Sequence, residues 1–161
     1  MNLARIELVV FDVDGVLTDG RLYFGARGES LKVFHVRDGH GIKLLMNAGL
    51  EVAIISGRRS AAVAARMREL GVRRVVQGCA DKVAALASLT RAAGVAPARC
   101  ACLVDDTPDL PLMASVGFAA AVADAHPLVR RAAHWVSRRA GGRGAARELC
   151  DALLLARAKQ R

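Results

Sequence analysis

The chain has 161 residues, of which 53% are hydrophobic and 24% are charged, and its formal net charge is +9. This length and this apolar fraction predict one domain with a substantial hydrophobic core, and they exclude disorder as the default state. Because aromatic residues make up only 4% of the chain, it is a poor candidate for the base-stacking platforms of single-strand nucleic-acid binders.

Short apolar runs alternate along the chain with longer segments of helical period, which is typical of a parallel sheet wrapped by helices. One segment breaks this alternation: residues 22–24 and 30–36, on either side of a glycine-containing turn, predict a β-hairpin after the first strand. In chain order we predict strands at 7–11, 51–55, 74–77, 100–104, 118–122 and 134–136, and helices at 40–48, 59–70, 81–93, 108–115, 126–132 and 144–158.

The positive charge is concentrated near the C-terminus. Residues 130–161 contain nine Lys and Arg side chains but only two acidic ones, Glu148 and Asp151, so this segment carries +7 of the total charge of +9. The rest of the chain is nearly balanced. From charge alone, an anionic substrate, an anionic partner and nucleic acid all stay open.

The four cysteines, Cys79, Cys100, Cys102 and Cys150, form no C-x-x-C pair and no repeated spacing with histidine. This disfavours a zinc site and a disulfide framework, and we expect the thiols to be buried and reduced in a cytoplasmic protein. The N-terminus does not resemble a signal peptide, because Asp12 ends the first apolar run. No stretch reaches the roughly 20 apolar residues of a membrane span, so we expect no membrane partner.

The strongest local signal follows the first predicted strand, where a buried run ends in Asp12, Asp14 and Gly15. Parallel sheets hold ligands at the carboxyl ends of their strands. Two carboxylates at that point suit metal binding and nucleophilic chemistry better than they suit packing. An ordinary Asx-rich turn is the alternative interpretation.

Polar residues also stand at the end of the second predicted strand and at the start of a later helix. Ser56 and Arg58, at a helix N-terminus, are suited to holding a phosphate, although serine there is also an ordinary N-cap. Lys82 begins the 81–93 helix, where it is either a solvated lysine or a charge that neutralises nucleophile and substrate.

The strand at 100–104 ends in a second group of carboxylates, Asp105, Asp106 and Asp109. An acid-rich helix cap is one interpretation. If this strand lies beside the first, however, the two groups converge on a hard cation such as Mg²⁺, which prefers oxygen ligands.

The order Asp-x-Asp, Ser, Lys, Asp-Asp resembles the four motifs of the haloacid dehalogenase-like phosphatases. Three longer blocks, FHVRDG at 34–39, AVADAHP at 121–127 and AGGRGA at 140–145, closely resemble the 3-deoxy-D-manno-octulosonate 8-phosphate phosphatase family. The similarity runs from about residue 7 to residue 158. It implies one phosphatase domain over 1–161, a Rossmann-like three-layer α/β/α sandwich with a mostly parallel sheet, a hairpin at about 22–36, a C-terminal segment at about 138–161 and no cap domain.

The resemblance implies an Mg²⁺-dependent phosphatase that forms an aspartyl-phosphate. Asp12 is implied as the nucleophile and Asp14 as the general acid and base. Ser56 is implied as a hydrogen-bond donor to the transferring phosphoryl group, and Lys82 as the cation that offsets its negative charge.

The family also implies the metal ligands. Mg²⁺ is implied on Asp12, the main chain of Asp14 and Asp105, with Asp106 and Asp109 orienting metal waters and Lys82.

The implied reaction converts 3-deoxy-D-manno-octulosonate 8-phosphate to 3-deoxy-D-manno-octulosonate and phosphate in lipopolysaccharide biosynthesis. The chain departs from the family at His35 and Lys43, where an uncharged polar residue and an arginine are common, and at Val104, where glycine usually precedes the Asp-Asp pair. Lys43 cannot bind a carboxylate with the bidentate geometry of arginine. Substrate contacts are implied at His35, Val36, Arg37, Asp38, Gly39, Lys43, Gly57, Arg58, Arg66 and Lys82.

The spacing of the motifs leaves no room for a lid, since Ser56 stands 44 positions after Asp12 and Lys82 only 26 after Ser56. An open site needs another element to exclude water from the substrate. The resemblance implies a homotetramer with subunit-shared active sites, in which the 22–36 hairpin supports assembly and residues 141–144 are a mobile element. A plain linker into the last helix is the alternative for this glycine cluster.

Other functions stay open at this point. A nonulosonate 9-phosphate or another sugar phosphate would use the same chemistry. A non-catalytic phospho-acceptor or binding module is a different class, and Asp14 argues against it because an acid/base near the nucleophile promotes dephosphorylation. Nucleic-acid binding through the basic segment predicts affinity that falls steeply with salt. We expect a small sugar phosphate, and not nucleic acid, as the partner.

Overall fold

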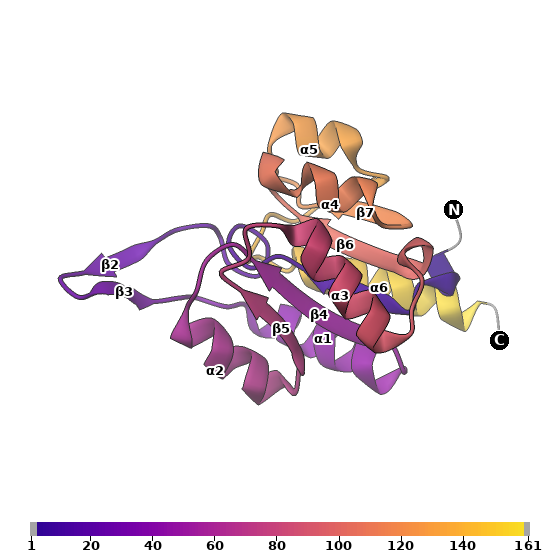
Figure 1. The fold of residues 1–161 in the computed structure, drawn as a ribbon, viewed down its shortest axis with the longest axis horizontal. Helices are drawn as coiled ribbons and strands as arrows, with labels where there is room; N and C mark the ends of the chain where they lie inside the picture. Colours follow the sequence, from indigo (N-terminus) through magenta and orange to yellow (C-terminus); the bar gives the residue numbers. More distant parts are fainter. Residues whose placement is uncertain (1–2, 160–161) are drawn as a thin grey trace.

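A six-stranded sheet forms the middle layer of the computed structural model, which describes residues 3–159 (Figure 1). The strand order is β5-β4-β1-β6-β7-β8, and every neighbouring pair is parallel. The predicted α/β sandwich is therefore confirmed. The strands are β1 (Leu8–Phe11), β4 (Glu51–Ser56), β5 (Arg74–Gln77), β6 (Cys100–Val104), β7 (Phe118–Ala121) and β8 (Trp135–Val136).

Helices cover both faces of the sheet (Figure 1). On one face α1 (Val36–Asn47) packs against α6 (Ala145–Ala158) and α2 (Ala61–Leu70). On the other, α3 (Lys82–Ala93) packs against α4 (Leu110–Ala114), which contacts α5 (Pro127–Ala132). Three short 3-10 helices complete the described chain: η1 (Leu3–Arg5), η2 (Pro97–Arg99) and η3 (Thr107–Asp109).

The central strands are buried on both faces, which explains why they appear in the sequence as continuous apolar runs. Every residue of β1, β6 and β7 is buried. Because β1 lies between β4 and β6, the chain leaves β1 toward one side of the sheet and later returns to the other. Such a switch point is where open α/β sheets bind ligands, at the carboxyl ends of the strands.

The hairpin projects from the carboxyl end of the sheet as a separate ribbon (Figure 1). It consists of β2 (Tyr23–Gly25) paired antiparallel with β3 (Gly28–Leu31), and it carries exposed apolar side chains, of which Phe24 is 62% exposed. The predicted second strand at 30–36 is wrong beyond Leu31, and the predicted helix at 40–48 begins too late. The reason is a cap: the Nδ1 atom of His35 accepts a hydrogen bond from the N–H of Arg37 at 3.2 Å and starts α1 at Val36.

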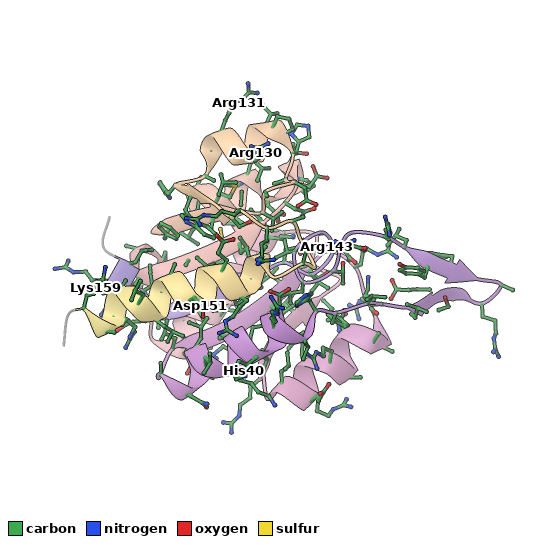
Figure 2. All side chains as sticks on the ribbon, turned by 180° about the vertical axis from the view of Figure 1, so that it is seen from behind. His40, Arg130, Arg131, Arg143, Asp151 and Lys159 are labelled. Atoms are coloured by element: carbon green, nitrogen blue, oxygen red, sulfur yellow. The ribbon has the colours of Figure 1, made fainter. Side chains whose placement is uncertain are left out.

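The basic C-terminal residues are distributed over several elements (Figure 2). Arg130 and Arg131 lie on α5, Arg143 lies in the loop before α6, and Lys159 follows the far end of α6. Arg161, which contributes to the predicted charge, lies outside the described residues. Among the described residues the excess charge is therefore divided between α5, the loop before α6 and α6 itself.

The burial of the cysteines and the lengths of the helices are two further features of the fold. Cys100, Cys102 and Cys150 are buried as predicted, whereas Cys79 is only partly buried, and all four thiols are free. Within residues 3–159, none of the helices combines the length and the apolar character that crossing a membrane requires.

Candidate active site

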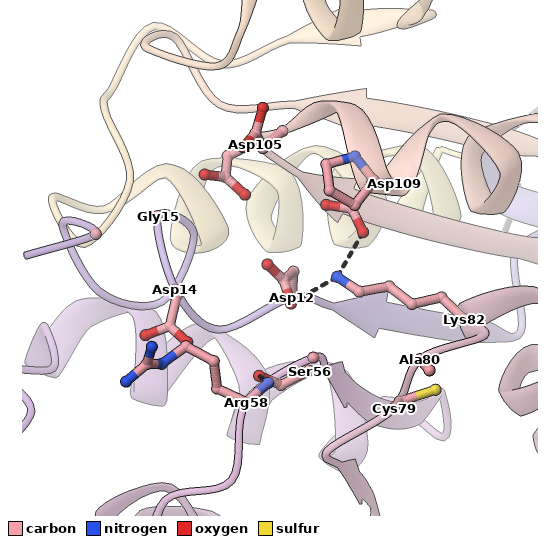
Figure 3. Close-up of a pocket in the computed structure, with 14 residues that line it drawn as sticks. Asp12, Asp14, Gly15, Ser56, Arg58, Cys79, Ala80, Lys82, Asp105 and Asp109 are labelled. Carbon is pink, nitrogen blue, oxygen red and sulfur yellow. Dashed lines mark hydrogen bonds and ion pairs between the residues drawn. The ribbon is translucent and has the colours of Figure 1, made fainter. Parts of the chain in front are cut away.

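Three strand ends meet at one pocket (Figure 3). Asp12 follows β1, Ser56 ends β4 and Asp105 follows β6, and all three line a cavity of about 350 Å³. The convergence predicted from the strand ends is present, because β1 pairs with β4 on one side and with β6 on the other. Asp14, Gly57, Arg58, Lys82, Asp106 and Asp109 line the same cavity.

Lys82 reaches into this pocket and pairs with two carboxylates (Figure 3). Its Nζ atom lies 3.0 Å from Oδ1 of Asp12 and 2.5 Å from Oδ1 of Asp109. Asp81 caps α3 by accepting hydrogen bonds from two backbone N–H groups, which places Lys82 at the first position of the helix. Burial by itself lowers the pKa of Lys82, but Asp12 and Asp109 outweigh it and raise the pKa above its usual value. This geometry favours a charge-neutralising lysine over a solvated one.

Three carboxylates gather beside Lys82 with too little positive charge to balance them. Oxygen atoms of Asp12, Asp105 and Asp109 all lie within 4.8 Å of one another. Burial raises the pKa of Asp12 to about 6. Burial, together with the charge of Asp12, raises the pKa of Asp105 to about 7. Such a set of buried oxygen donors fits a hard divalent cation such as Mg²⁺.

Gly15 keeps the space next to Asp105 open. Its φ angle is +79°, and a Cβ atom added there would lie 2.0 Å from Oδ2 of Asp105. A side chain at position 15 would therefore fill the cradle in which a cation fits, which explains a glycine immediately after the Asp-x-Asp motif.

The side chain of Asp14 points away from the three carboxylates. Its Oδ1 atom is hydrogen-bonded to Nζ of Lys32, and its Oδ2 atom lies 3.8 Å from Nε of Arg58. The predicted contribution of Asp14 to the metal was its main chain, and its free carboxylate edge lines the pocket. Ser56 is buried, with its Oγ accepting the N–H of Arg58 at 3.4 Å.

Asp106 and Asp109 occupy different positions although only two residues separate them in the chain. Asp106 is exposed and accepts the N–H of Thr107 at 2.7 Å, so it caps η3. Asp109 is buried, and its Oδ1 atom pairs with Nζ of Lys82, which also pairs with Asp12. Asp109 contacts Lys82, as the resemblance implies, and it also lies within the group of three carboxylates. The side chain of Asp106 contacts the backbone of Thr107, and its role in orienting metal waters stays a prediction.

The glycine loop at 141–144 supports the loop that carries Asp12 and Asp14. Gly142 donates its N–H to the carbonyl of Val16 at 2.8 Å, and Gly141 donates to Oδ1 of Asp124 at 2.9 Å. A Cβ atom on Gly141 would lie 1.7 Å from the carbonyl oxygen of Gly15. These glycines permit close packing against the loop after Asp12, and the mobility expected of residues 141–144 stays a prediction.

The comparisons with known proteins agree with this geometry. A family model described as haloacid dehalogenase-like hydrolase matches residues 71–149. A 3-deoxy-D-manno-octulosonate 8-phosphate phosphatase from Yersinia pestis is 48% identical over 156 residues, which are 97% of this chain and 83% of that protein. The chain belongs to the 3-deoxy-D-manno-octulosonate 8-phosphate phosphatase family. It is therefore a phosphatase.

Solved structures of this family share the fold almost completely. A cobalt-bound form from Haemophilus influenzae has a TM-score of 0.97 and 45% identity, and the match covers 99% of this chain and 93% of that one. An enzyme of the family from Moraxella catarrhalis, in complex with a magnesium ion, a phosphate ion and KDO, has a TM-score of 0.94 and 37% identity, covering 98% of this chain and 91% of that one.

The residues that the family implies for substrate contact fall into two groups. Gly57, Arg58 and Lys82 line the pocket beside Asp12. The other seven do not line it: His35, Val36, Arg37, Asp38, Gly39 and Lys43 belong to the start of α1 or precede it, and Arg66 lies on α2.

Within the described chain these seven residues have other surroundings. Val36 is 76% exposed, and Arg37 and Lys43 are exposed too. Arg66 pairs with Glu69 at 2.8 Å and lies against Gly39, where a Cβ atom would lie 2.3 Å from its Nη2.

Asp38 has a clear structural role in addition to its predicted one. Its carboxylate accepts the N–H of Arg147 at 2.8 Å and the N–H of Gly144 at 3.3 Å. It therefore caps the start of α6 from α1 and fixes the end of the glycine loop. Burial raises the pKa of Asp38, and the two backbone hydrogen bonds act in the opposite direction.

The sequence did not reveal four of the residues that line the pocket, nor the contact that Lys32 makes with Asp14 from outside it. Gly20, Cys79, Ala80 and Pro108 also line the cavity. Cys79 stands two positions after the end of β5, so its place beyond a strand end was the available signal. Lys32, which contacts Asp14, lies 18 residues from it and follows no strand of the parallel sheet, so no such signal marked it.

Proposed function

We propose that this chain hydrolyses 3-deoxy-D-manno-octulosonate 8-phosphate to 3-deoxy-D-manno-octulosonate and phosphate, as a step of lipopolysaccharide biosynthesis. The observation that carries the proposal is Asp12, a buried carboxylate 3.0 Å from Lys82 in a pocket that also contains Asp14 and Ser56. The name and the reported complex of the family members with magnesium, phosphate and KDO support the substrate and the cofactor.

The first half of the reaction transfers the phosphoryl group to the enzyme. A carboxylate oxygen of Asp12 attacks phosphorus, the bond to the sugar oxygen breaks, and Asp14 gives its proton to the departing alkoxide. Ser56 donates a hydrogen bond to the phosphoryl oxygens, and Lys82 offsets the repulsion between the carboxylate and the phosphate.

The second half regenerates the enzyme. Water attacks the aspartyl-phosphate, Asp14 takes the proton of that water, and the bond between phosphorus and Asp12 breaks to release inorganic phosphate. Asp12, Asp105 and the main chain of Asp14 are the groups that would hold Mg²⁺, with Asp109 beside them. When bound there, Mg²⁺ supplies positive charge next to the transferring phosphoryl group.

A homotetramer with shared active sites would bring the remaining substrate residues to the pocket. His35, Arg37, Lys43 and Arg66 do not line the cavity of their own chain. The hairpin carries exposed apolar residues that suit assembly. We place this enzyme in the cytoplasm, where its thiols stay reduced.

Phosphate release from a panel of sugar phosphates, with Mg²⁺ and with a chelator, tests this function. We expect hydrolysis only with the metal, and the highest kcat/KM for 3-deoxy-D-manno-octulosonate 8-phosphate. A higher kcat/KM for a nonulosonate 9-phosphate would move the assignment to that substrate. Absence of release from every ester, with the metal bound, would refute the enzymatic function.

A further inference from the structure

A group of charged and polar residues from the hairpin and from the loop before α2 lies beside Asp14. We define the hairpin network as Glu29, Lys32, Arg58 and Ser60. Lys32 Nζ contacts Oδ1 of Asp14 and lies 3.1 Å from Oε2 of Glu29. The side chain of Lys32 is only 2% exposed, and Lys32 does not line the cavity. It therefore acts on Asp14 from outside the pocket.

Glu29 is held from three sides, so the position of Lys32 is fixed in turn. Its Oε1 atom accepts the hydroxyl of Ser60 at 2.5 Å, and its Oε2 atom accepts Nη2 of Arg58 at 3.3 Å. Burial alone raises the pKa of Glu29, but the hydrogen bonds from Ser60 and Lys32 outweigh it and lower the pKa. Glu29 is thus an ionised anchor on β3, opposite Phe24 of β2.

The two oxygens of Asp14 have different surroundings as a result. Oδ1 is occupied by Lys32, while the nearest cation to Oδ2 is Arg58 Nε at 3.8 Å, beyond hydrogen-bond distance. Arg58 and Asp14 both line the cavity (Figure 3). Oδ2 is therefore the oxygen that is free to face a substrate.

We propose that Lys32, anchored by Glu29, is a positioning residue that fixes the Asp14 carboxylate with Oδ2 toward the pocket, so that Oδ2 is the atom that carries the proton. In the first half-reaction the proton on Oδ2 goes to the leaving alkoxide as the phosphorus–oxygen bond breaks. In the second half Oδ2 takes the proton of the water that attacks the aspartyl-phosphate. This inference rests on the proposed phosphatase function and adds to it the group that orients the acid and base.

The role of Lys32 matters most where a proton must move. An alkyl phosphate such as the sugar ester needs a proton on its leaving oxygen, whereas the nitrophenolate of p-nitrophenyl phosphate departs without one. Hydrolysis of the aspartyl-phosphate needs the base with either substrate. Loss of orientation should therefore slow both halves with the sugar ester, but only the second half with the aryl ester.

The test compares Lys32→Met and Lys32→Arg with wild type under saturating Mg²⁺. With the sugar ester, Lys32→Met should lower kcat by about 10-fold or more and change KM by less than about two-fold, because general acid–base catalysis contributes roughly 10²–10⁴ in rate. With p-nitrophenyl phosphate, rapid mixing of Lys32→Met should give a burst of one nitrophenolate per active site, formed at the wild-type rate and followed by slow turnover. Lys32→Arg should restore most of kcat.

Two further variants separate positioning from stability. Glu29→Gln should reproduce the same pattern with a smaller loss, and it tests the proposal if Lys32→Met does not fold. Arg74→Met, which removes the cation of the Arg74–Glu51 ion pair at 2.9 Å far from the pocket, is the matched control and should keep wild-type kcat and burst.

Three results would overturn the proposal: a kcat for folded Lys32→Met within about two-fold of wild type, an equal loss of burst and turnover, or a change confined to KM. If wild type hydrolyses p-nitrophenyl phosphate but not the sugar ester, the proposed substrate fails, and the burst experiment still decides the role of Lys32.

Discussion

Asp14 lies between two groups of charged side chains that are built differently. We call the first the strand-end cluster: Asp12, Ser56, Lys82, Asp105 and Asp109, which come from the ends of β1, β4 and β6 and from the helices that follow β5 and β6. The second is the hairpin network: Glu29 lies on the two-stranded antiparallel ribbon and Lys32 directly follows it, while the other two residues lie between β4 and α2. The first is fixed by the backbone of the sheet, and the second is fixed by its own side-chain contacts.

This difference predicts how each group should respond when one of its side chains is replaced. The strand-end cluster sits on buried strands, so removing one charge leaves the others in place, buried and unbalanced. A two-stranded ribbon is marginally stable by itself, so removing one contact of the hairpin network should shift the average position of the rest. We expect losses that are nearly complete in the first group and graded in the second.

The largest effect is expected for Asp12→Asn. An amide cannot act as the nucleophile, so turnover should fall by at least about 10⁴-fold, as measured by phosphate release. Asp19→Asn is the control, because Asp19 lies in the same loop but contacts Arg21. Appreciable phosphate release by folded Asp12→Asn would contradict the nucleophile assignment.

Gly15→Ala tests the cation cradle without removing a carboxylate. The added Cβ would lie 2.0 Å from Oδ2 of Asp105 at a φ of +79°, so calorimetry should show Mg²⁺ affinity reduced by about 10-fold or more. Gly49→Ala is a close control, since Gly49 has a φ of +80° and nothing within 4 Å of its added Cβ. Both variants carry the same backbone strain, and equal Mg²⁺ affinities would show that the cradle is not at Gly15.

The contrast between the two groups also explains what the sequence could reveal. Asp12, Ser56 and Asp105 were predictable because parallel strands bring their carboxyl ends to one edge, and the apolar runs mark those ends. Lys32 was not, since its contact with Asp14 depends on the path of the chain after β3. A histidine cap at His35 is outside the usual N-cap residues, so the start of α1 was also missed.

The glycine loop shows a second limit of sequence patterns. Glycines at 141, 142 and 144 suggest mobility or a plain linker, yet a side chain at Gly141 or Gly142 would overlap the loop after Asp12. The pattern of residues is the same whether glycine supplies freedom or permits close approach. Only the neighbouring backbone, distant in sequence, distinguishes the two.

The raised carboxylate pKa values predict an unusual pH dependence for the metal-free protein. Burial raises the pKa of Asp12 to about 6 and that of Asp105 to about 7, from the ordinary aspartate value of 3.8. Between pH 4 and pH 7 the folded state therefore binds more protons than the unfolded state, so its stability falls as pH rises. With a chelator present, we expect Tm to drop by about 5 °C or more from pH 5 to pH 8.

Two further measurements, on the variant Asp105→Asn and on wild type with added Mg²⁺, show whether the carboxylates cause this drop in Tm. Asp105→Asn should make Tm less dependent on pH, because the group with the pKa of about 7 is gone. Mg²⁺ should raise the Tm of wild type at pH 8, since it binds only the folded state. A Tm that is flat from pH 5 to pH 8 and unchanged in Asp105→Asn would contradict the inference that unbalanced carboxylate charge destabilises the metal-free protein.

The smallest effect is expected for Ser60→Ala, which removes one contact of the hairpin network. The Ser60 hydroxyl donates to Oε1 of Glu29 at 2.5 Å, and a hydrogen bond to a charged group contributes about 1.5–3 kcal/mol. Because Lys32 and Arg58 still hold Glu29, most of this free energy should be recovered, and kcat should fall only about two- to five-fold. Ser30→Ala is the matched control: the Ser30 hydroxyl donates to the carbonyl of Tyr23 at 2.9 Å, within the same hairpin, and this bond does not involve the neighbouring Glu29. A loss of kcat in Ser60→Ala as large as in Lys32→Met would show that the hairpin network, like the strand-end cluster, loses its function when any one contact is removed. Equal kcat in Ser60→Ala and Ser30→Ala would show that Lys32 alone orients Asp14.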